Sequence, residues 1–182
     1  MKKILYILLL LSVVPCVAFS DGGGGVFLGK QQASYPMLEH LSVPNNSLGL
    51  SYYGGCGYGV SSDNTITGGF GVAVVPEDAS TGIGGGFGGL VNGFRILRWP
   101  LTLQVVNYAG LGGFSTGAEA ADFFGFFEEL TVEVGIPLAR WFMPTLFAGY
   151  QVIGRFASGN ELFDVFSYTP VVGVKISWGD FY

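Results

Sequence analysis

The segment from Glu129 to Leu138 alternates strictly between apolar residues and residues that are charged, polar or small. A period of two predicts a β-strand with two unlike faces, because successive side chains of a strand point to opposite sides. Such a strand fits a sheet that separates an apolar environment from a polar one. The polar face includes Glu129 and Glu133, and the apolar face comprises Leu130, Val132, Val134, Ile136 and Leu138.

Similar alternation, weaker in the glycine-rich segments, recurs along the rest of the chain. Several segments have about 9 to 12 residues, which suits a tilted membrane strand better than the average soluble strand of about 5 to 6. An even number of strands also allows a meander to close. The sequence therefore predicts an all-β fold, a closed antiparallel up-and-down transmembrane barrel of about eight strands. The expected strands are 24–31, 47–55, 65–75, 82–91, 101–110, 128–138, 145–155 and 168–179.

Composition indicates which face of these strands turns outward. Hydrophobic residues make up 49% of the chain and charged residues only 12%, about half the share of an ordinary soluble domain. A face of Gly, Ser and Thr would hydrate poorly as an outer surface, but it suits a narrow lumen. We therefore expect the apolar faces to contact lipid, among them Leu48, Leu50 and Tyr52, then Ile66, Phe70, Val72 and Val74, and finally Val172, Val174, Ile176 and Trp178. Periodicity alone leaves open a soluble exported barrel that binds an apolar ligand inside.

The N-terminal segment predicts export. Residues 1–20 have the features of a cleaved signal peptide: two lysines, an apolar run over 4–14 and the small-x-small triplet Ala18-Phe19-Ser20. The mature chain is then a single barrel domain, 21–182, in the bacterial outer membrane. Cys16 leaves open an alternative as a lipidated cysteine. With Cys16 removed, Cys56 has no cysteine with which to form an intramolecular disulfide.

Long and short connections alternate, so both termini are expected on the periplasmic side. All three tryptophans then fall at periplasmic strand ends, and with Tyr52 they predict an interfacial aromatic girdle: Trp99, Trp141, Trp178 and Tyr52. Tyr53 and Tyr58 are placed at the same end, and Tyr108 at the other. Charges are expected to separate in the same way, with carboxylates in the outer loops and Arg95, Arg98 and Arg140 in the inner turns.

Two buried charge pairs are expected inside the barrel. Antiparallel register about 139–144 sets Glu133 near Gly149, and register about 156–167 sets Lys175 near the same level. Gly149 has no side chain, so Lys175 could cross that strand to reach Glu133. Glu129 and Arg155 could form a second pair by the same reasoning.

The last eleven residues resemble the final strand of bacterial outer-membrane β-barrels, in which alternating apolar residues lead to a terminal aromatic. The alternation is carried by Val172, Val174, Ile176, Trp178 and Tyr182. The resemblance implies an assembly signal, formed by Trp178, Phe181 and Tyr182, that the barrel-assembly machinery recognises. Asp180 departs from the alternation, which leaves either a bulge near Phe181 or an atypical signal. The chain is most similar to the small OmpA-like or OmpX-like barrels without a periplasmic domain.

The remaining residues offer little catalytic chemistry. A net charge of −5 argues against a nucleic-acid partner, and a single histidine argues against a metal site, so we expect no cofactor. His40 and Ser42 form a His-x-Ser pair similar to that of outer-membrane lipid A deacylases, which leaves a lipid-modifying hydrolase as an alternative. Residues 118–127 have helical spacing and suggest a short interfacial helix or a loop packed on the rim. The leading expectation is a non-enzymatic, monomeric barrel with a filled lumen, in contact with outer-membrane lipid, that serves envelope structure or surface interaction.

Overall fold

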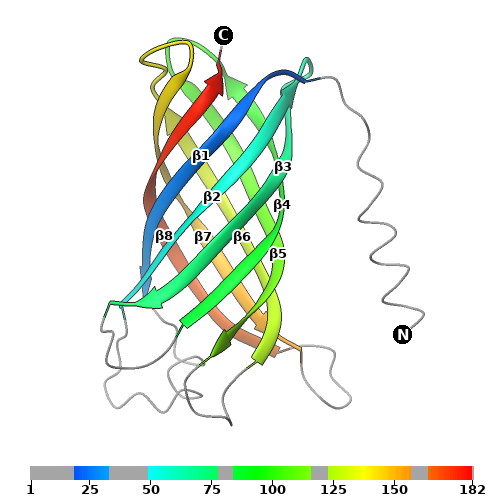
Figure 1. Cartoon of the computed structure of the whole chain (residues 1–182), viewed down its shortest axis with the longest axis vertical. Helices are drawn as coiled ribbons and strands as arrows, with labels where there is room; N and C mark the ends of the chain where they lie inside the picture. Colours follow the sequence, from blue (N-terminus) through cyan, green and yellow to red (C-terminus); the bar gives the residue numbers. More distant parts are fainter. Residues whose placement is uncertain (1–18, 33–48, 78–83, 116–122, 157–163, 182) are drawn as a thin grey trace, which may run out of the picture.

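The computed structural model describes residues 19–32, 49–77, 84–115, 123–156 and 164–181. All regular secondary structure in these ranges is β, and the predicted closed antiparallel barrel of eight strands is confirmed (Figure 1). Each strand pairs with the next, and β8 closes the barrel against β1. The strands are β1 Phe19–Gln32, β2 Gly49–Ser61, β3 Thr65–Pro76, β4 Gly84–Leu97, β5 Thr102–Ser115, β6 Phe123–Gly135, β7 Phe142–Arg155 and β8 Asp164–Asp180.

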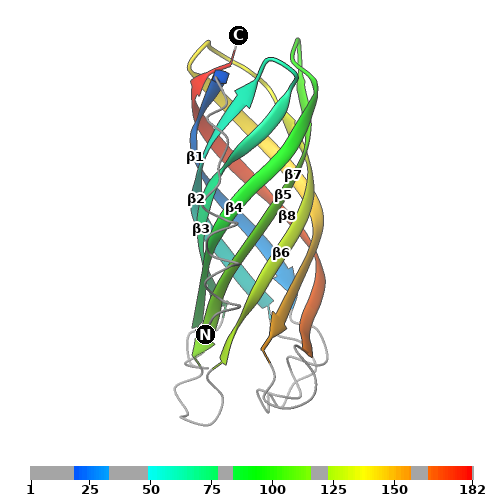
Figure 2. The same cartoon turned by 90° about the vertical axis from the view of Figure 1, so that its right-hand side faces the viewer.

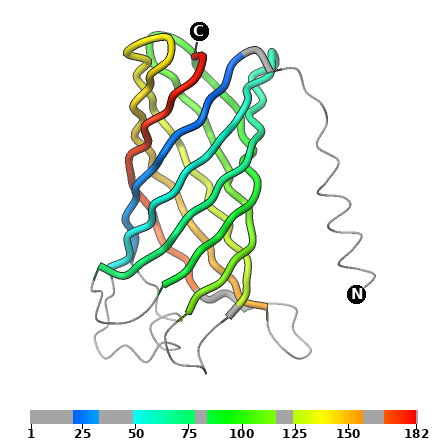
Figure 3. Tube along the Cα trace, in the orientation of Figure 1, coloured from blue at the N-terminus to red at the C-terminus, as the bar shows by residue number. Residues whose placement is uncertain are grey.

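The two ends of the barrel differ. At one end, which we call the turn end, lie the short connections 62–64, 98–101 and 136–141, together with the start of β1 and the end of β8. The opposite end, the loop end, is where strands lead into and out of 33–48, 77–83, 116–122 and 156–163 (Figures 1 and 3). Several strands are longer than predicted, and β4 in particular continues to Leu97 instead of ending at residue 91.

The strands are strongly staggered. Cross-strand partners can be followed from Gly24 in β1 through successive strands to Val152 in β7 and then Tyr168 in β8. Gly24 itself pairs with Trp178, ten residues further along β8 than Tyr168. Such a shift requires the strands to tilt against the barrel axis, as Figure 2 shows, and an eight-stranded barrel is just wide enough for side chains to fill.

In β6, β7 and β8 the side chains point as the alternation predicts. Leu130, Val132 and Val134 are exposed on the outer surface, whereas Glu133 and Lys175 are buried inside. The same division holds for Leu146 and Tyr150 outside β7, and for Val172, Val174, Ile176 and Trp178 outside β8.

In β2 and β3 the expected orientation is wrong. Leu50 and Tyr52 of β2 point into the barrel, and Leu48 lies outside the described residues. In β4, Phe87 and Val91 also point inward. The predicted lipid-facing set of β3 is also buried inside, namely Ile66, Phe70, Val72 and Val74. The physical reason is that the alternate positions of these strands are mostly Gly, Ser and Thr, which cannot fill the interior.

One further expectation is corrected at the start of β6. This strand begins at Phe123, so residues 123–127 are neither a helix nor a rim loop. Large aromatic side chains are common in strands, and helical spacing over ten residues is too short to outweigh the pairing with β5. Residues 118–122 lie outside the described part of the chain.

Candidate functional site

The centre of the lumen holds a buried ion pair. Lys175 Nζ from β8 donates a hydrogen bond to the Glu133 carboxylate from β6, and the two side chains are 2% and 1% exposed. Tyr108 Oη donates to Glu133 Oε1 at 2.7 Å, and Gln104 Nε2 donates to Glu133 Oε2 at 2.6 Å. Lys175 also lies 3.3 Å from Tyr108 Oη and 5.4 Å from the centre of the Tyr58 ring. Both charges are therefore compensated without water.

The structure brings Glu133 and Lys175 together in a register different from the predicted one. Glu133 is opposite Phe147 rather than Gly149, and Lys175 is opposite Thr145. The expected register is off by two residues between β6 and β7 and by about four between β7 and β8. Even shifts leave every side chain on its original face, which is why the pair forms despite the errors. Phe147 has room because Gly173 lies opposite it, and a Cβ added to Gly173 would collide with the Phe147 ring.

Glu129 lies in a separate network that is closer to the loop end. Gln151 Nε2 donates to Glu129 Oε2 at 2.9 Å, and Tyr52 Oη is 3.4 Å from Glu129 Oε1. The predicted pairing of Glu129 with Arg155 is not found, because Glu129 is level with Gln151, four residues before Arg155 in β7. Arg155 is instead opposite Gly125 and Asp164 in the strand ladder.

A third charged cluster, at the turn end, was missed by the sequence reasoning. Arg95 of β4 is buried and its Nη1 donates to Asp21 Oδ2 of β1 at 3.0 Å, while Arg98 Nη1 lies 3.4 Å from the same oxygen. We expected Arg95 in a turn because β4 was predicted to end too early. The available signal was spacing, since Arg95 follows Phe87 and Val91 at even intervals and therefore shares their inward face.

Aromatic rings fill the space between these clusters. Eight rings form a continuous series with neighbouring centroids 5.4 to 6.2 Å apart. The cavity among them measures about 10 Å³, which is about the space that one water molecule requires. At the level of these rings the lumen is therefore closed. In chain order the rings are Phe27, Tyr52, Phe70, Phe87, Tyr108, Phe114, Phe127 and Phe147.

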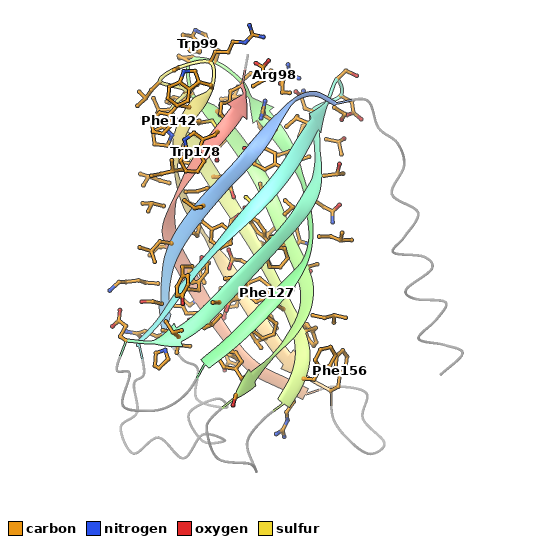
Figure 4. All side chains as sticks on the ribbon, viewed as in Figure 1. Arg98, Trp99, Phe127, Phe142, Phe156 and Trp178 are labelled. Carbon is orange, nitrogen blue, oxygen red and sulfur yellow. The ribbon has the colours of Figure 1, made fainter. Side chains whose placement is uncertain are left out.

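The outer surface carries large apolar side chains over β5 to β8 and β1. Exposed residues near the middle of the strands include Val26, Leu28, Leu111, Leu130, Val132, Val134, Leu146, Val172 and Val174. Figure 4 shows Trp99 and Trp178 at the turn end and Phe156 at the loop end. Phe127, which is also labelled there, is buried in the lumen between the two ends. Trp141 is exposed at the end of connection 136–141.

Tyr52 does not belong with these tryptophans. Its side chain is 1% exposed and points into the lumen near the loop end of β2. Tyr58 and Tyr108 are also buried inside rather than placed at the rims, whereas Tyr53 is exposed. A phenol needs a hydrogen-bond partner when it is buried, and the carboxylates of the lumen serve Tyr52 and Tyr108 in that way.

At the C-terminal end, pairing between β8 and β1 stays regular as far as Asp180, without the bulge that the sequence left open. Trp178 points outward, and Phe181, which follows β8 at the turn end, is 2% exposed. Asp180 accepts hydrogen bonds from Arg140 Nε and Nη2, which accounts for a charge at this position. Tyr182 lies outside the described residues.

The hydrolase alternative cannot be placed, because His40 and Ser42 lie outside the described residues. Within the described ranges, no three His, Cys, Asp or Glu side chains are arranged to hold a metal ion. No helix in those ranges is long and apolar enough to cross a bilayer. In sequence comparisons, no protein-family model matches this chain and no curated protein is significantly similar to it.

Proposed function

We propose that this chain is an integral protein of the bacterial outer membrane, with a non-enzymatic role in envelope structure or surface interaction. The observation that carries the proposal is the inverted polarity of β6 to β8. These strands place a buried ion pair and amide side chains inside and large aliphatic side chains outside. In water, aliphatic side chains on the outer surface and charges in the interior would both be unfavourable. In a lipid bilayer, the aliphatic side chains on the outer surface are favourable.

The filled lumen supports a role that depends on the outer surface rather than on transport. A cavity of about 10 Å³ leaves no room for an apolar ligand or a hydrated ion. This argues against the soluble ligand-binding alternative and against a pore. The carboxylate oxygens of the central lumen are engaged by Lys175, Tyr108, Gln104, Tyr52 and Gln151.

Membrane location can be tested by fractionation of cells that express the full chain. We expect the protein in the outer-membrane fraction, resistant to carbonate extraction, and faster-migrating on a gel when the sample is not boiled. Recovery in the soluble periplasmic fraction would contradict the proposal and favour the soluble barrel.

Single-cysteine labelling tests whether the outer face of β6 is in contact with lipid. With Cys56 replaced by Ala, Val132→Cys should resist a water-soluble maleimide, because its side chain would face acyl chains. Arg140→Cys is the matched control, since the Arg140 side chain is 71% exposed beside the turn end and should react. Equal reaction at both positions would show that β6 does not face lipid.

A further inference from the structure

The outer surface of β2, β3 and β4 is almost free of side chains over six neighbouring glycines. We call this region the glycine face. The neighbours of these residues in each strand, such as Cys56, Phe70 and Phe87, are buried inside, so the glycines themselves face outward. Gly57 pairs with Gly69, Gly55 with Gly71, and Gly71 with Gly88, which makes the region continuous. The glycine face comprises Gly55, Gly57, Gly69, Gly71, Gly86 and Gly88.

Packing within the barrel explains the inward glycines but not those of the glycine face. A Cβ added to Gly29 or Gly173 would collide with the rings of Tyr52 and Phe147. By contrast, a Cβ on Gly57 or Gly71 would meet no atom within 4 Å. At the other four glycines the nearest atom is 3.3 to 3.6 Å away. Glycine weakens a strand, so its use on an open surface indicates close approach by something outside the barrel.

A pair of outward-facing amides borders the glycine face. Asn92 of β4 and Asn107 of β5 are directly opposite each other, and Thr67 of β3 is opposite Asn92. No hydrogen bond to the exposed Asn92 side chain is found within the described residues. Asn107 Nδ2 lies 3.5 Å from Glu128 Oε1, and Asn107 Oδ1 is buried without a hydrogen-bond partner among the described residues, so the Asn92 amide is the one accessible from outside. Asn92 lies well inside its strand, where lipid would leave its amide unsatisfied.

We propose that the glycine face and Asn92 form the contact surface for a second copy of this chain in the membrane. An amide both donates and accepts hydrogen bonds, so the same residue in a second copy can satisfy it across a two-fold axis. An axis along the membrane normal keeps both barrels in the same orientation. Bare backbone lets the two sheets approach closely enough for the short asparagine side chains to meet, as small residues do between membrane helices.

This inference rests on the proposed membrane location and replaces the expectation of a monomer. That expectation could not take account of the glycine face, because the sequence pattern assigned the wrong orientation to β2 and β3. The opposite side of the barrel offers no comparable surface, since Val172, Val174 and Ile176 of β8 project from it.

Cross-linking in reconstituted lipid vesicles tests the contact. In a Cys56→Ala background, Leu90→Cys places a thiol on the outer surface of β4 between Gly88 and Asn92 and leaves both in place. We expect a short thiol-reactive cross-linker to convert most of this variant to dimer. Val174→Cys, outward on the opposite strand β8, is the matched control and should stay at the level of the Cys56→Ala background.

A second variant distinguishes loss of the contact between the two copies from loss of folding. Gly57→Val with Gly71→Val, added to Leu90→Cys, introduces side chains into space that the barrel leaves empty. Thermal unfolding of this variant should be unchanged or shifted upward, while the yield of cross-linked dimer falls at least tenfold. Asn92→Leu in the same background should reduce the yield as well.

The outcomes distinguish the proposed dimer from the proposed membrane location. A membrane-embedded protein in which Leu90→Cys gives no more dimer than Val174→Cys would overturn the dimer and show that lipid or another protein covers the glycine face. Unchanged cross-linking after the valine substitutions would overturn it too. A protein that fails to enter the membrane fraction contradicts the proposed function instead.

Discussion

Strands β6 to β8 and strands β2 to β4 are two parts of one closed sheet with opposite polarity. The first group holds Glu129, Glu133 and Lys175 inside and aliphatic side chains outside. The second holds Leu50, Ile66 and Phe70 inside and leaves its outer face largely to glycine. The charges of the central lumen therefore come from one group of strands, and the bare part of the outer surface belongs to the other.

The comparison teaches that a period of two defines two faces without saying which of them is inside. In β6 and β8 the charges decide, because Glu129, Glu133 and Lys175 find partners inside the lumen, although Glu128 of β6 faces outward beside Asn107. In β2 to β4 neither face is charged at mid-strand, and the need to fill a narrow interior decides instead. The two parts should accordingly respond to substitution in opposite ways.

The largest effect is expected from the charges of β6 to β8. Glu133→Gln leaves the Lys175 ammonium buried without its carboxylate, which should cost about 3–5 kcal/mol, as should Lys175→Met, while the double variant should cost little. Urea unfolding in detergent micelles measures all three. Glu77→Gln, which removes one partner of an exposed ion pair at the loop end, is the control and should change stability by no more than about 1 kcal/mol. Simple additivity of the two single substitutions would mean that the charges do not depend on each other.

Two isoleucines test the reversal directly. Ile66 is 1% exposed inside β3, whereas Ile136 is 49% exposed just after β6. Ile66→Ala should cost about 2–5 kcal/mol because it opens a cavity, and Ile136→Ala only about 1 kcal/mol because detergent or lipid fills the space. The two unfolding free energies, compared in the same micelles, give the result. An Ile136 variant that is the less stable of the two would reverse our assignment of faces.

A charge on the bulky outer surface should be costly in lipid. Val134→Arg places a guanidinium on the outer face of β6 toward the turn end. An arginine costs about 2–4 kcal/mol at the bilayer midplane and about 0–1 kcal/mol near the interface, so we expect a loss between these values. Folding into vesicles over a urea series measures the change, with Val134→Leu as the conservative control. No loss of stability for the arginine variant would indicate that water reaches this face.

The smallest effect concerns the turn between β2 and β3. Ser61 Oγ and the Thr65 backbone N–H donate to the Asp63 carboxylate, and together they lower the pKa of Asp63 from its ordinary value of 3.8. The stability that Asp63 contributes is therefore complete above that pH and is lost as the pH falls through the lowered value. Asp63→Asn should be slightly less stable than the natural chain at pH 7, and the difference should shrink below pH 3.8 in thermal unfolding scans. A difference that stays constant with pH would exclude the carboxylate as its source.

The barrel class and strand number were predictable because alternation and turn residues are local properties of the sequence. The contact of Glu133 with Lys175 was predictable for a related reason, since charges at inward positions need partners. The absolute register was not predictable, and the two-residue error near Gly149 had no effect on the faces. A one-residue error would have reversed them.

The interior of β2 to β4 was not predictable from apolar content alone. Tyr52 fits either an aromatic girdle or a lumen, and its position follows from Gly29, which leaves room for the ring across the strand pair. Likewise, the contact of Asp21 with Arg95 depends on barrel closure, which no local pattern contains. The glycine runs were the available signal. Where one face of a strand carries mostly glycine, the large side chains of its other face must fill the interior.

The partners inside the lumen are far apart along the chain, and this constrains the order in which the barrel assembles. Glu133 and Lys175 are separated by 42 residues, Arg95 and Asp21 by 74, and Tyr52 and Glu129 by 77. No hairpin of adjacent strands contains both members of any of these contacts. Within adjacent strands, Gln104 and Tyr108 can reach Glu133, and Gln151 can reach Glu129. The Lys175 ammonium and the Arg95 guanidinium, by contrast, reach their carboxylates only when more distant strands come together. Completion of the barrel and pairing of these charges therefore depend on each other, and the long sequence separations favour slow folding.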